Sequence, residues 1–194
     1  RIQEFPHVSL AGNHDQAALG NLDLRTFNRD ARYANLWTQS ELKASSFEYL
    51  ASLPSHMERE GFYLAHASPR EPVWEYLLDP KQAYDNFSYF DGQVCLVGHT
   101  HVPIIFRLEE EEQHCAMLLP SADPVPLNPH RLIINPGSVG QPRDGDPRAS
   151  YALLDTEAMT WEFHRVAYPI QITQERMRAR GLPWRLIERL EVGR

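Results

Sequence analysis

The stretch Gly98-His99-Thr100-His101 decides how the rest of this sequence is interpreted. An apolar run at residues 93–97 precedes it and is typical of a buried strand, and Gly98 allows a sharp turn where that strand ends. In an extended segment, side chains two residues apart lie on the same side, so we expect His99 and His101 to face one pocket. Imidazole is the commonest metal ligand, although two surface histidines in a polar turn would show the same pattern. The stretch therefore predicts a metal site only if other ligands join it.

Two other segments end in polar turns that carry possible ligands. Residues 7–11 alternate into a predicted short strand that ends at Gly12-Asn13-His14-Asp15, and residues 61–65 form a predicted strand that ends at His66. Because sites in open α/β sheets form at the carboxyl ends of strands, we expect the three turns to meet at one edge. Taken singly, each histidine would favour a structural role, and Asp15 could instead cap the following helix.

The remaining pattern predicts an α/β protein. Residues 16–55 are helical in pattern, and Thr38 with Glu41 fits a capping box that would begin a helix closed by Pro54. Helices are also predicted after Thr173 and Pro183. Short antiparallel strands are expected at residues 102–108, 115–119, 131–134, 150–154 and 160–166, with the glutamates at 109–112 on a hairpin tip. Without an internal repeat or a flexible linker, we expect residues 1–194 to form one domain.

Composition narrows the function classes. Hydrophobic residues make up 42% of the 194 residues, which is typical of a folded chain, and no apolar run approaches the length of a membrane-spanning helix. The net charge of −7 argues against a surface for duplex nucleic acid. Two cysteines are too few for a disulfide framework; we expect Cys95 to be a buried free thiol, with a Cys95–Cys115 bond left open. The default location is the cytoplasm.

Four segments, in this order, resemble the calcineurin-like metallophosphoesterases: Gly12-Asn13-His14-Asp15, Ala65-His66-Ala67, Gly98-His99-Thr100-His101 and Asn135-Pro136-Gly137-Ser138. The last segment is expected to shape a turn near the site. Residues 135–145 are similar to the small bacterial and archaeal phosphodiesterase branch of that family. The resemblance implies an α/β fold, a four-layer α/β/β/α sandwich, with a site for two metal ions.

The resemblance also implies a role for each site residue. Asn13, His66 and His99 match the ligands of one metal, and His101 matches a ligand of the other. His14 matches the general acid beside the leaving group, and Asp15 matches the acid that orients it. Two divalent ions, Mn²⁺ first, with Fe, Ni, Co or Zn as alternatives, would hold a bridging hydroxide for in-line attack on phosphorus. Arg143 could meet a substrate phosphate, or be an ordinary surface arginine.

The sequence departs from the family pattern before Asn13. The family carries an Asp-x-His motif and a Gly-Asp motif upstream of its Gly-Asn-His-Asp segment, and neither occurs in the twelve residues that precede Asn13. These motifs would supply a bridging carboxylate and other ligands of the metal that His101 binds. We expect the sequence to begin partway through a longer protein; a naturally truncated chain, with poor metal binding and little activity, is the alternative.

The function implied by the resemblance is a metal-dependent phosphoesterase, specifically a phosphodiesterase acting on a small phosphate ester or a nucleotide. The alternative is a catalytically impaired member of the family that acts as a protein-interaction scaffold. A histidine-triad hydrolase is excluded because its third alternating histidine is replaced by Pro103. The oligomeric state and the natural substrate stay open. Most aromatic residues around the site are expected to pack, and some could line a substrate lid: Phe27, Tyr33, Trp37, Trp74, Tyr76, Tyr84 and Tyr89.

Overall fold

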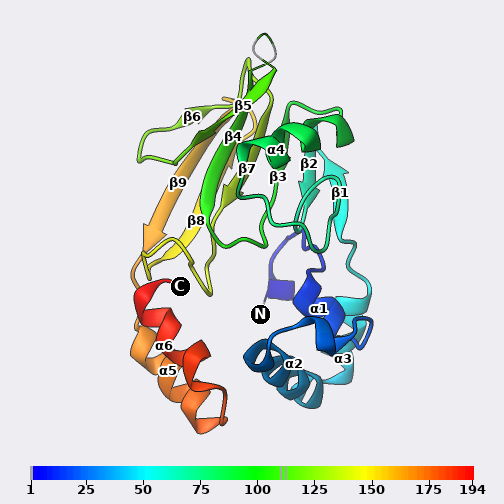
Figure 1. Ribbon diagram of the computed structural model, residues 1–194, viewed down its shortest axis with the longest axis vertical. Helices are drawn as coiled ribbons and strands as arrows, with labels where there is room; N and C mark the ends of the chain where they lie inside the picture. Colours follow the sequence, from blue (N-terminus) through cyan, green and yellow to red (C-terminus); the bar gives the residue numbers. More distant parts are fainter. Residues whose placement is uncertain (1, 110, 112) are drawn as a thin grey trace.

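A six-stranded mixed sheet is the centre of the computed structural model, which describes residues 2–109, 111 and 113–194 (Figure 1). Its strand order is β1-β2-β3-β7-β4-β5. Neighbours β2, β3 and β7 run parallel, whereas β1, β4 and β5 each pair antiparallel with their neighbours. The strands are β1 (His56–Arg59), β2 (Phe62–Ala65), β3 (Val94–Leu96), β4 (Pro103–Glu109), β5 (His114–Leu118) and β7 (Leu132–Pro136).

A second, antiparallel sheet in the order β6-β9-β8 packs on one face of the first. It consists of β6 (Val125–Pro126), β8 (Ala149–Asp155) and β9 (Thr160–Val166). Alternate side chains of the facing strands, among them Trp161, Ile105 and Ile134, are buried between the two sheets. Removing these apolar side chains from water is the main force that holds the sheets together.

Helix α4 (Pro80–Asn86) and the short helix η3 (Phe87–Tyr89) cover the other face of the large sheet. Asp79 caps α4 by accepting hydrogen bonds from the N–H groups of Lys81 and Gln82, and Pro80 suits its first turn. Phe87 packs with Cys95 and other sheet residues into an apolar core. Cys95 and Cys115 are buried free thiols, so the expectation for Cys95 is confirmed and no disulfide joins the two.

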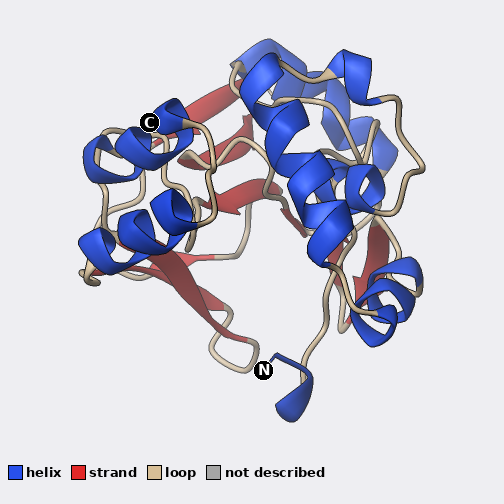
Figure 2. Ribbon diagram, turned by 90° about the horizontal axis from the view of Figure 1, so that it is seen from below, coloured by secondary structure: helices blue, strands red, loops and turns tan. Residues whose placement is uncertain are grey.

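Two groups of helices lie at the same end of the sheets, on opposite sides (Figures 1 and 2). One group follows the N-terminal η1 (Ile2–Glu4) and contains α1 (Asn13–Ala18), η2 (Leu24–Thr26), α2 (Arg29–Glu41) and α3 (Ala44–Ala51). The other contains α5 (Ile170–Ala179) and α6 (Trp184–Val192). The α/β class with two packed sheets agrees with the sequence-based expectation. None of the helices that the structure describes has the length and apolar character needed to cross a membrane.

Several local predictions were wrong. Residues 7–11 do not form a strand; Ala11 donates its N–H to the carbonyl of Pro54 instead, because alternation alone does not supply a pairing partner. Thr38 lies inside α2, where its hydroxyl donates to the carbonyl of Ala34, and α3 begins after Lys43. Helix α5 begins at Ile170, before Thr173. The predicted glutamate hairpin tip falls partly on residues 110 and 112, which lie outside the described residues.

Candidate functional site

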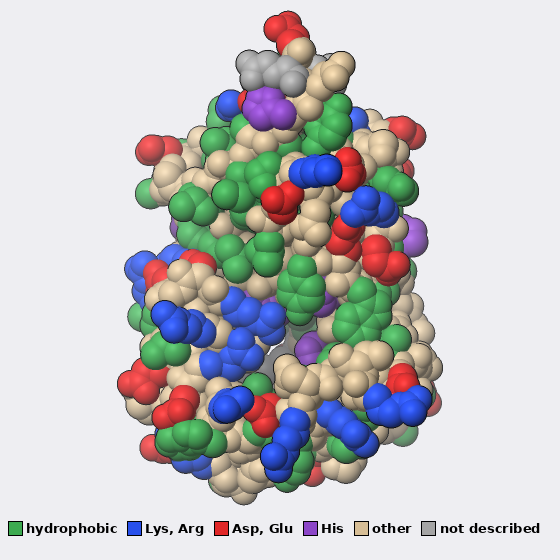
Figure 3. Space-filling view, in the orientation of Figure 1, with side chains coloured by type: hydrophobic (Ala, Val, Ile, Leu, Met, Phe, Trp, Pro, Cys, Tyr) green, Lys and Arg blue, Asp and Glu red, His purple; other side chains and the backbone are tan. Residues whose placement is uncertain are grey.

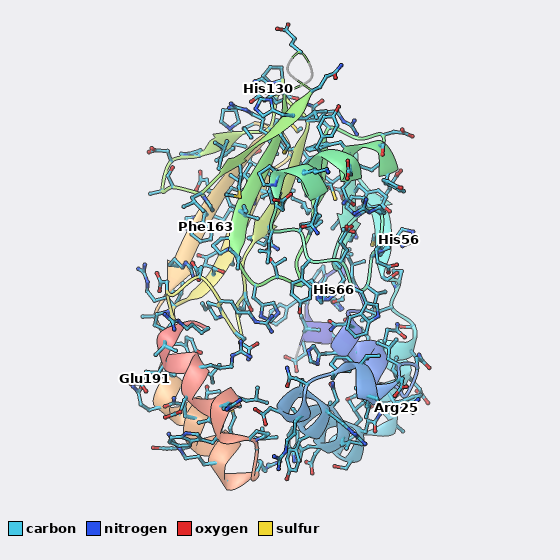
Figure 4. The ribbon with its side chains drawn as sticks, in the orientation of Figure 1. Arg25, His56, His66, His130, Phe163 and Glu191 are labelled. Carbon is cyan, nitrogen blue, oxygen red and sulfur yellow. The ribbon has the colours of Figure 1, made fainter. Side chains whose placement is uncertain are left out.

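Three side-chain atoms from separate parts of the chain meet at the end of the large sheet. Asn13 is the first residue of α1, His66 directly follows β2, and His99 follows β3. The Nε2 atom of His66 lies 3.2 Å from Oδ1 of Asn13 and 3.2 Å from Nδ1 of His99. Figure 4 shows His66 at the lower end of the sheets, above α1. The structure thus brings together the three residues that the sequence predicts as ligands of one metal.

The chemistry of this cluster fits a cation. Nε2 of His99 donates a hydrogen bond to the carbonyl of Trp74 at 3.2 Å, which leaves a lone pair on Nδ1. Nε2 of His66 therefore faces two acceptors, Nδ1 of His99 and Oδ1 of Asn13, and one N–H cannot satisfy both well. Ligands held about 2.1 Å from a single cation are separated by about 3.0–3.4 Å, in octahedral or tetrahedral geometry. The two observed distances of 3.2 Å fall within this range.

Burial keeps these imidazoles neutral. Asn13 and His99 are almost fully buried. Burial, with the neighbouring His66 as the second cause, lowers the pKa of His99 to about 4, and burial also lowers the pKa of His66. A neutral imidazole has the lone pair that metal binding requires. Across the described residues, no group of three or more His, Cys, Asp and Glu side chains converges on one point, so this cluster depends on the Asn13 amide.

The loop from Gly98 to His101 differs from the extended segment that we expected. His99 has a φ of 61° and His101 a φ of 60°, both in the left-handed region that non-glycine residues rarely adopt. Buried Asn135 holds this loop, because its Nδ2 donates to the carbonyl of Gly98 at 2.6 Å and to the hydroxyl of Thr100 at 2.9 Å. Strained backbone of this kind persists where the surroundings enforce it, most often at functional sites.

His101 lies beside the three-atom cluster and has a different set of contacts. Its Nδ1 donates to the carbonyl of Gln141 at 2.7 Å, which leaves the lone pair on Nε2. Burial first, and then the nearby Arg143 guanidinium, lower the pKa of His101 to about 4. Its predicted role as the ligand of a second metal stays a prediction.

His14 is held by a residue that sequence reasoning missed. Its Nδ1 lies 3.0 Å from Oδ1 of the buried Asn35 in α2, so the imidazole donates there, and His14 as a whole residue is exposed. Asp15, predicted to orient His14, instead accepts a hydrogen bond from the N–H of Gly12 at 2.8 Å and caps α1. The cap is the alternative that the sequence offered for Asp15, but the sequence contains no signal for the Asn35 contact, because Asn35 lies 21 residues away from His14.

Gly12 is required by the close approach of α1 to His66. A Cβ atom at position 12 would lie 2.5 Å from Cε1 of the His66 ring, closer than atoms can pack. Any side chain at this position would force either the His66 ring or the start of α1 to move, and either movement would change the spacing between His66 and Asn13.

A half-buried carboxylate fixes the loop behind His99. Glu75 accepts hydrogen bonds from the hydroxyl of Ser68 at 2.6 Å, from Nδ2 of Asn86 at 3.0 Å and from the Arg70 guanidinium. Burial opposes its ionisation, but these hydrogen bonds outweigh burial and lower the pKa of Glu75. Its neighbours Trp74 and Tyr76 contact His99, Trp74 through its carbonyl and Tyr76 with ring centroids 4.1 Å apart. No sequence pattern distinguishes Glu75 from the other acidic residues.

Arg143 lies next to His101, as the sequence-based suggestion of a substrate contact requires. Its backbone N–H donates to the carbonyl of His101 at 3.1 Å, and its guanidinium donates to Oε1 of Gln141 at 2.8 Å. Whether its guanidinium meets a substrate phosphate stays a prediction.

Comparison with known proteins agrees with this geometry. The sequence profile of the calcineurin-like phosphoesterase superfamily domain matches residues 2–159. An uncharacterized protein of Methanocaldococcus jannaschii is 37% identical over 198 residues, covering 100% of this chain and 78% of that protein. The crystal structure of a metallophosphoesterase from Sphaerobacter thermophilus is 46% identical, with a TM-score of 0.88 over 97% of this chain and 78% of the other.

A hypothetical protein from Pyrococcus horikoshii OT3 shares the fold, with a TM-score of 0.72, 19% identity, and coverage of 97% of this chain and 74% of that one. The profile match, the two more similar relatives and the arrangement of the site lead to the same conclusion. This chain belongs to the calcineurin-like phosphoesterase superfamily.

Proposed function

We propose that the protein is a metal-dependent phosphodiesterase. The observation that carries the proposal is the convergence of Oδ1 of Asn13, Nε2 of His66 and Nδ1 of His99 at 3.2 Å spacings beside His101. Asn13, His66 and His99 would hold one divalent ion and His101 would contribute to the second. Mixed nitrogen and oxygen ligands favour transition metals, with Mn²⁺ first and Fe, Ni, Co or Zn as alternatives. Such ions supply positive charge to the phosphate and activate the attacking water.

His14 would complete the reaction by protonating the leaving group. When its Nε2 is protonated, the imidazole gives that proton to the ester oxygen as the phosphorus–oxygen bond breaks, so the product leaves as an alcohol. Asn35 holds the ring by accepting from Nδ1 at 3.0 Å, which directs Nε2 outward to the substrate. Asn13, as a neutral ligand, adds no negative charge that would repel the phosphate.

The test is hydrolysis of bis(p-nitrophenyl) phosphate and of p-nitrophenyl phosphate by the protein with Mn²⁺, after removal of bound metal. We expect the diester to be hydrolysed with the higher kcat/KM, and His99→Ala to abolish the activity and lower the bound metal. His130→Ala is the matched control, because His130 is exposed at the opposite end of the molecule (Figure 4). If the wild-type protein hydrolyses the diester no faster than His99→Ala does, the proposal is wrong. If the wild-type protein also binds no metal, the scaffold alternative is favoured.

A further inference from the structure

A large cavity lies between α2 and α6, the two helices that face each other below the sheets. Its volume is about 1300 Å³. Pockets for drug-sized ligands measure about 300–1,000 Å³, so this one has room for a larger molecule. Arginines make up five of its lining residues, and Asp30 is the only acid among them. Figure 3 shows Lys and Arg side chains gathered around the hollow at this end of the molecule, with histidines at its rim. This concentration of positive charge contrasts with the net charge of −7 of the whole chain.

Three of the five arginines that line this cavity are free to bind an anion. Within the described part of the chain, Arg29, Arg32 and Arg185 have no carboxylate within the 4.0 Å of an ion pair. Arginine guanidinium groups bind phosphate with paired hydrogen bonds, and several unpaired ones around one space attract a polyanion. Two aromatic side chains also line the cavity, Trp184 at 59% exposed and Tyr33 at 49% exposed. Exposed rings of this size are suited to stack on a nucleobase.

Covalent and hydrogen-bonded connections join the cavity to the candidate metal site on both sides. Helix α2 contributes Arg32 and Tyr33 to the cavity and Asn35, two residues further on, to His14. On the other side, the segment that contains Arg143 bonds to His101 and then to the end of α6, through the N–H of Gly145 and the carbonyl of Gly193 at 2.9 Å. Burial first, and then the nearby Arg143, lower the pKa of Arg189, which lines the cavity, so the cavity borders the segment that contacts His101. A leaving group beside His14 would extend toward it.

We propose that this cavity binds the leaving-group portion of the substrate, and that the substrate is a nucleotide phosphodiester with at least one further phosphate. The arginines bind the additional phosphate, and the rings of Trp184 and Tyr33 stack on the base. This inference rests on the proposed function, since it assigns the substrate class of the same site. A diester without a further charged group binds at the metal site but gains no additional affinity from the cavity.

The first test compares two dinucleotides that differ by one phosphate, ApA and its 5′-phosphorylated form pApA. We expect the wild-type protein to hydrolyse pApA with a kcat/KM about tenfold above that for ApA, because a hydrogen-bonded charge contributes that much. In Arg32→Gln and in Arg185→Gln, kcat/KM should fall more for pApA than for ApA or bis(p-nitrophenyl) phosphate. Each substitution should therefore remove the preference for pApA over ApA. Arg59→Gln is the control, since Arg59 lies exposed in β1 and pairs with its neighbour Glu60. Equal kcat/KM for pApA and ApA would overturn the inference.

A second test separates this inference from the proposed function. ADP is titrated into the protein by calorimetry with EDTA present, so that no hydrolysis or metal bridge contributes. We expect saturable binding that Arg32→Gln and Arg185→Gln each weaken about tenfold and Trp184→Ala also weakens. Binding of this kind supports the cavity even if no diester is hydrolysed. If the protein hydrolyses the diester but does not bind ADP, the nucleotide-binding role of the cavity is wrong and the proposed function stands. If single-stranded RNA binds more tightly than ADP, the assignment to a small nucleotide is wrong.

Discussion

Around His99 both imidazole nitrogens face a partner, whereas around the cavity between α2 and α6 unpaired arginines face the space they line. The first region is buried, braced by Glu75 and Asn135, and holds backbone in a rarely populated conformation. The second is open, and among the described residues three of its arginines, Arg29, Arg32 and Arg185, have no carboxylate partner. This difference fits the two proposed roles, because metal ligands must be held within narrow geometry, whereas a substrate surface can gain its order from the bound ligand.

The change with the largest expected effect removes a ligand from the rigid side. His66→Ala should lower diester kcat/KM by about 10³-fold, because metal-ion catalysis contributes several kcal/mol and each 1.36 kcal/mol is tenfold. Steady-state kinetics with Mn²⁺ and metal analysis of the same sample measure this. His56→Ala serves as the control, since this histidine of β1 is exposed and its ring stacks on Tyr63. A His66→Ala protein with full metal content and activity would contradict the ligand assignment.

His14→Ala tests the proposed general acid, which lies between the candidate metal site and the cavity. A positioned general acid contributes about 10²–10⁴-fold, so we expect that loss on substrates with alkyl leaving groups. Bis(p-nitrophenyl) phosphate, whose leaving group needs no proton, should lose far less. Comparing kcat for the two substrate types measures the effect, with Asn35→Ala expected to show the same selectivity in weaker form. Equal losses on both substrate types would remove the general-acid role of His14.

Glu75→Gln weakens the hydrogen bonds that hold the loop behind His99, and it leaves the candidate ligands themselves unchanged. Residues that orient metal ligands typically contribute about 10–100-fold to metal affinity, and we expect a weakening toward the lower end of that range. Competition against a chelator of known affinity measures it. Glu71→Gln is a nearby control, because the side chain of Glu71 is exposed and the hydrogen bonds of this residue use its backbone. Unchanged metal affinity in Glu75→Gln would show that the loop holds His99 without this carboxylate.

The smallest expected effect is on the pH dependence of the free energy of unfolding. Because folding lowers the pKa of Glu75 below its ordinary value of 4.5, its charge stabilises the fold above that pH. This contribution is lost as the pH falls through the lower, folded pKa. Urea unfolding between pH 7 and pH 3 should therefore show a decline in the free energy of unfolding that is shallower in Glu75→Gln. Parallel pH profiles for the two proteins would contradict the coupling.

The candidate ligands could be named from the sequence because each lies in a polar turn at, or close to, the end of a predicted strand, in the order of a known family. The backbone that presents them could not be inferred in the same way. An alternating His-x-His pattern predicts an extended segment, but the contacts of Asn135 impose left-handed conformations on His99 and His101. The orienting partner of His14 was also missed, because Asn35 reaches it only after α2 packs against α1.

The sequence by itself determined the α/β class and the superfamily, and it named Asn13, His66, His99 and His101 as candidate ligands, because strand periodicity and short motifs are local properties of the chain. Only the tertiary structure decided that Asp15 caps α1 while Asn35 holds His14, that Glu75 braces His99, and that α2 and α6 enclose a cavity lined by arginines. The physical reason is distance along the chain: these contacts join residues from separate elements, and their geometry exists only once the helices have packed at the end of the sheets.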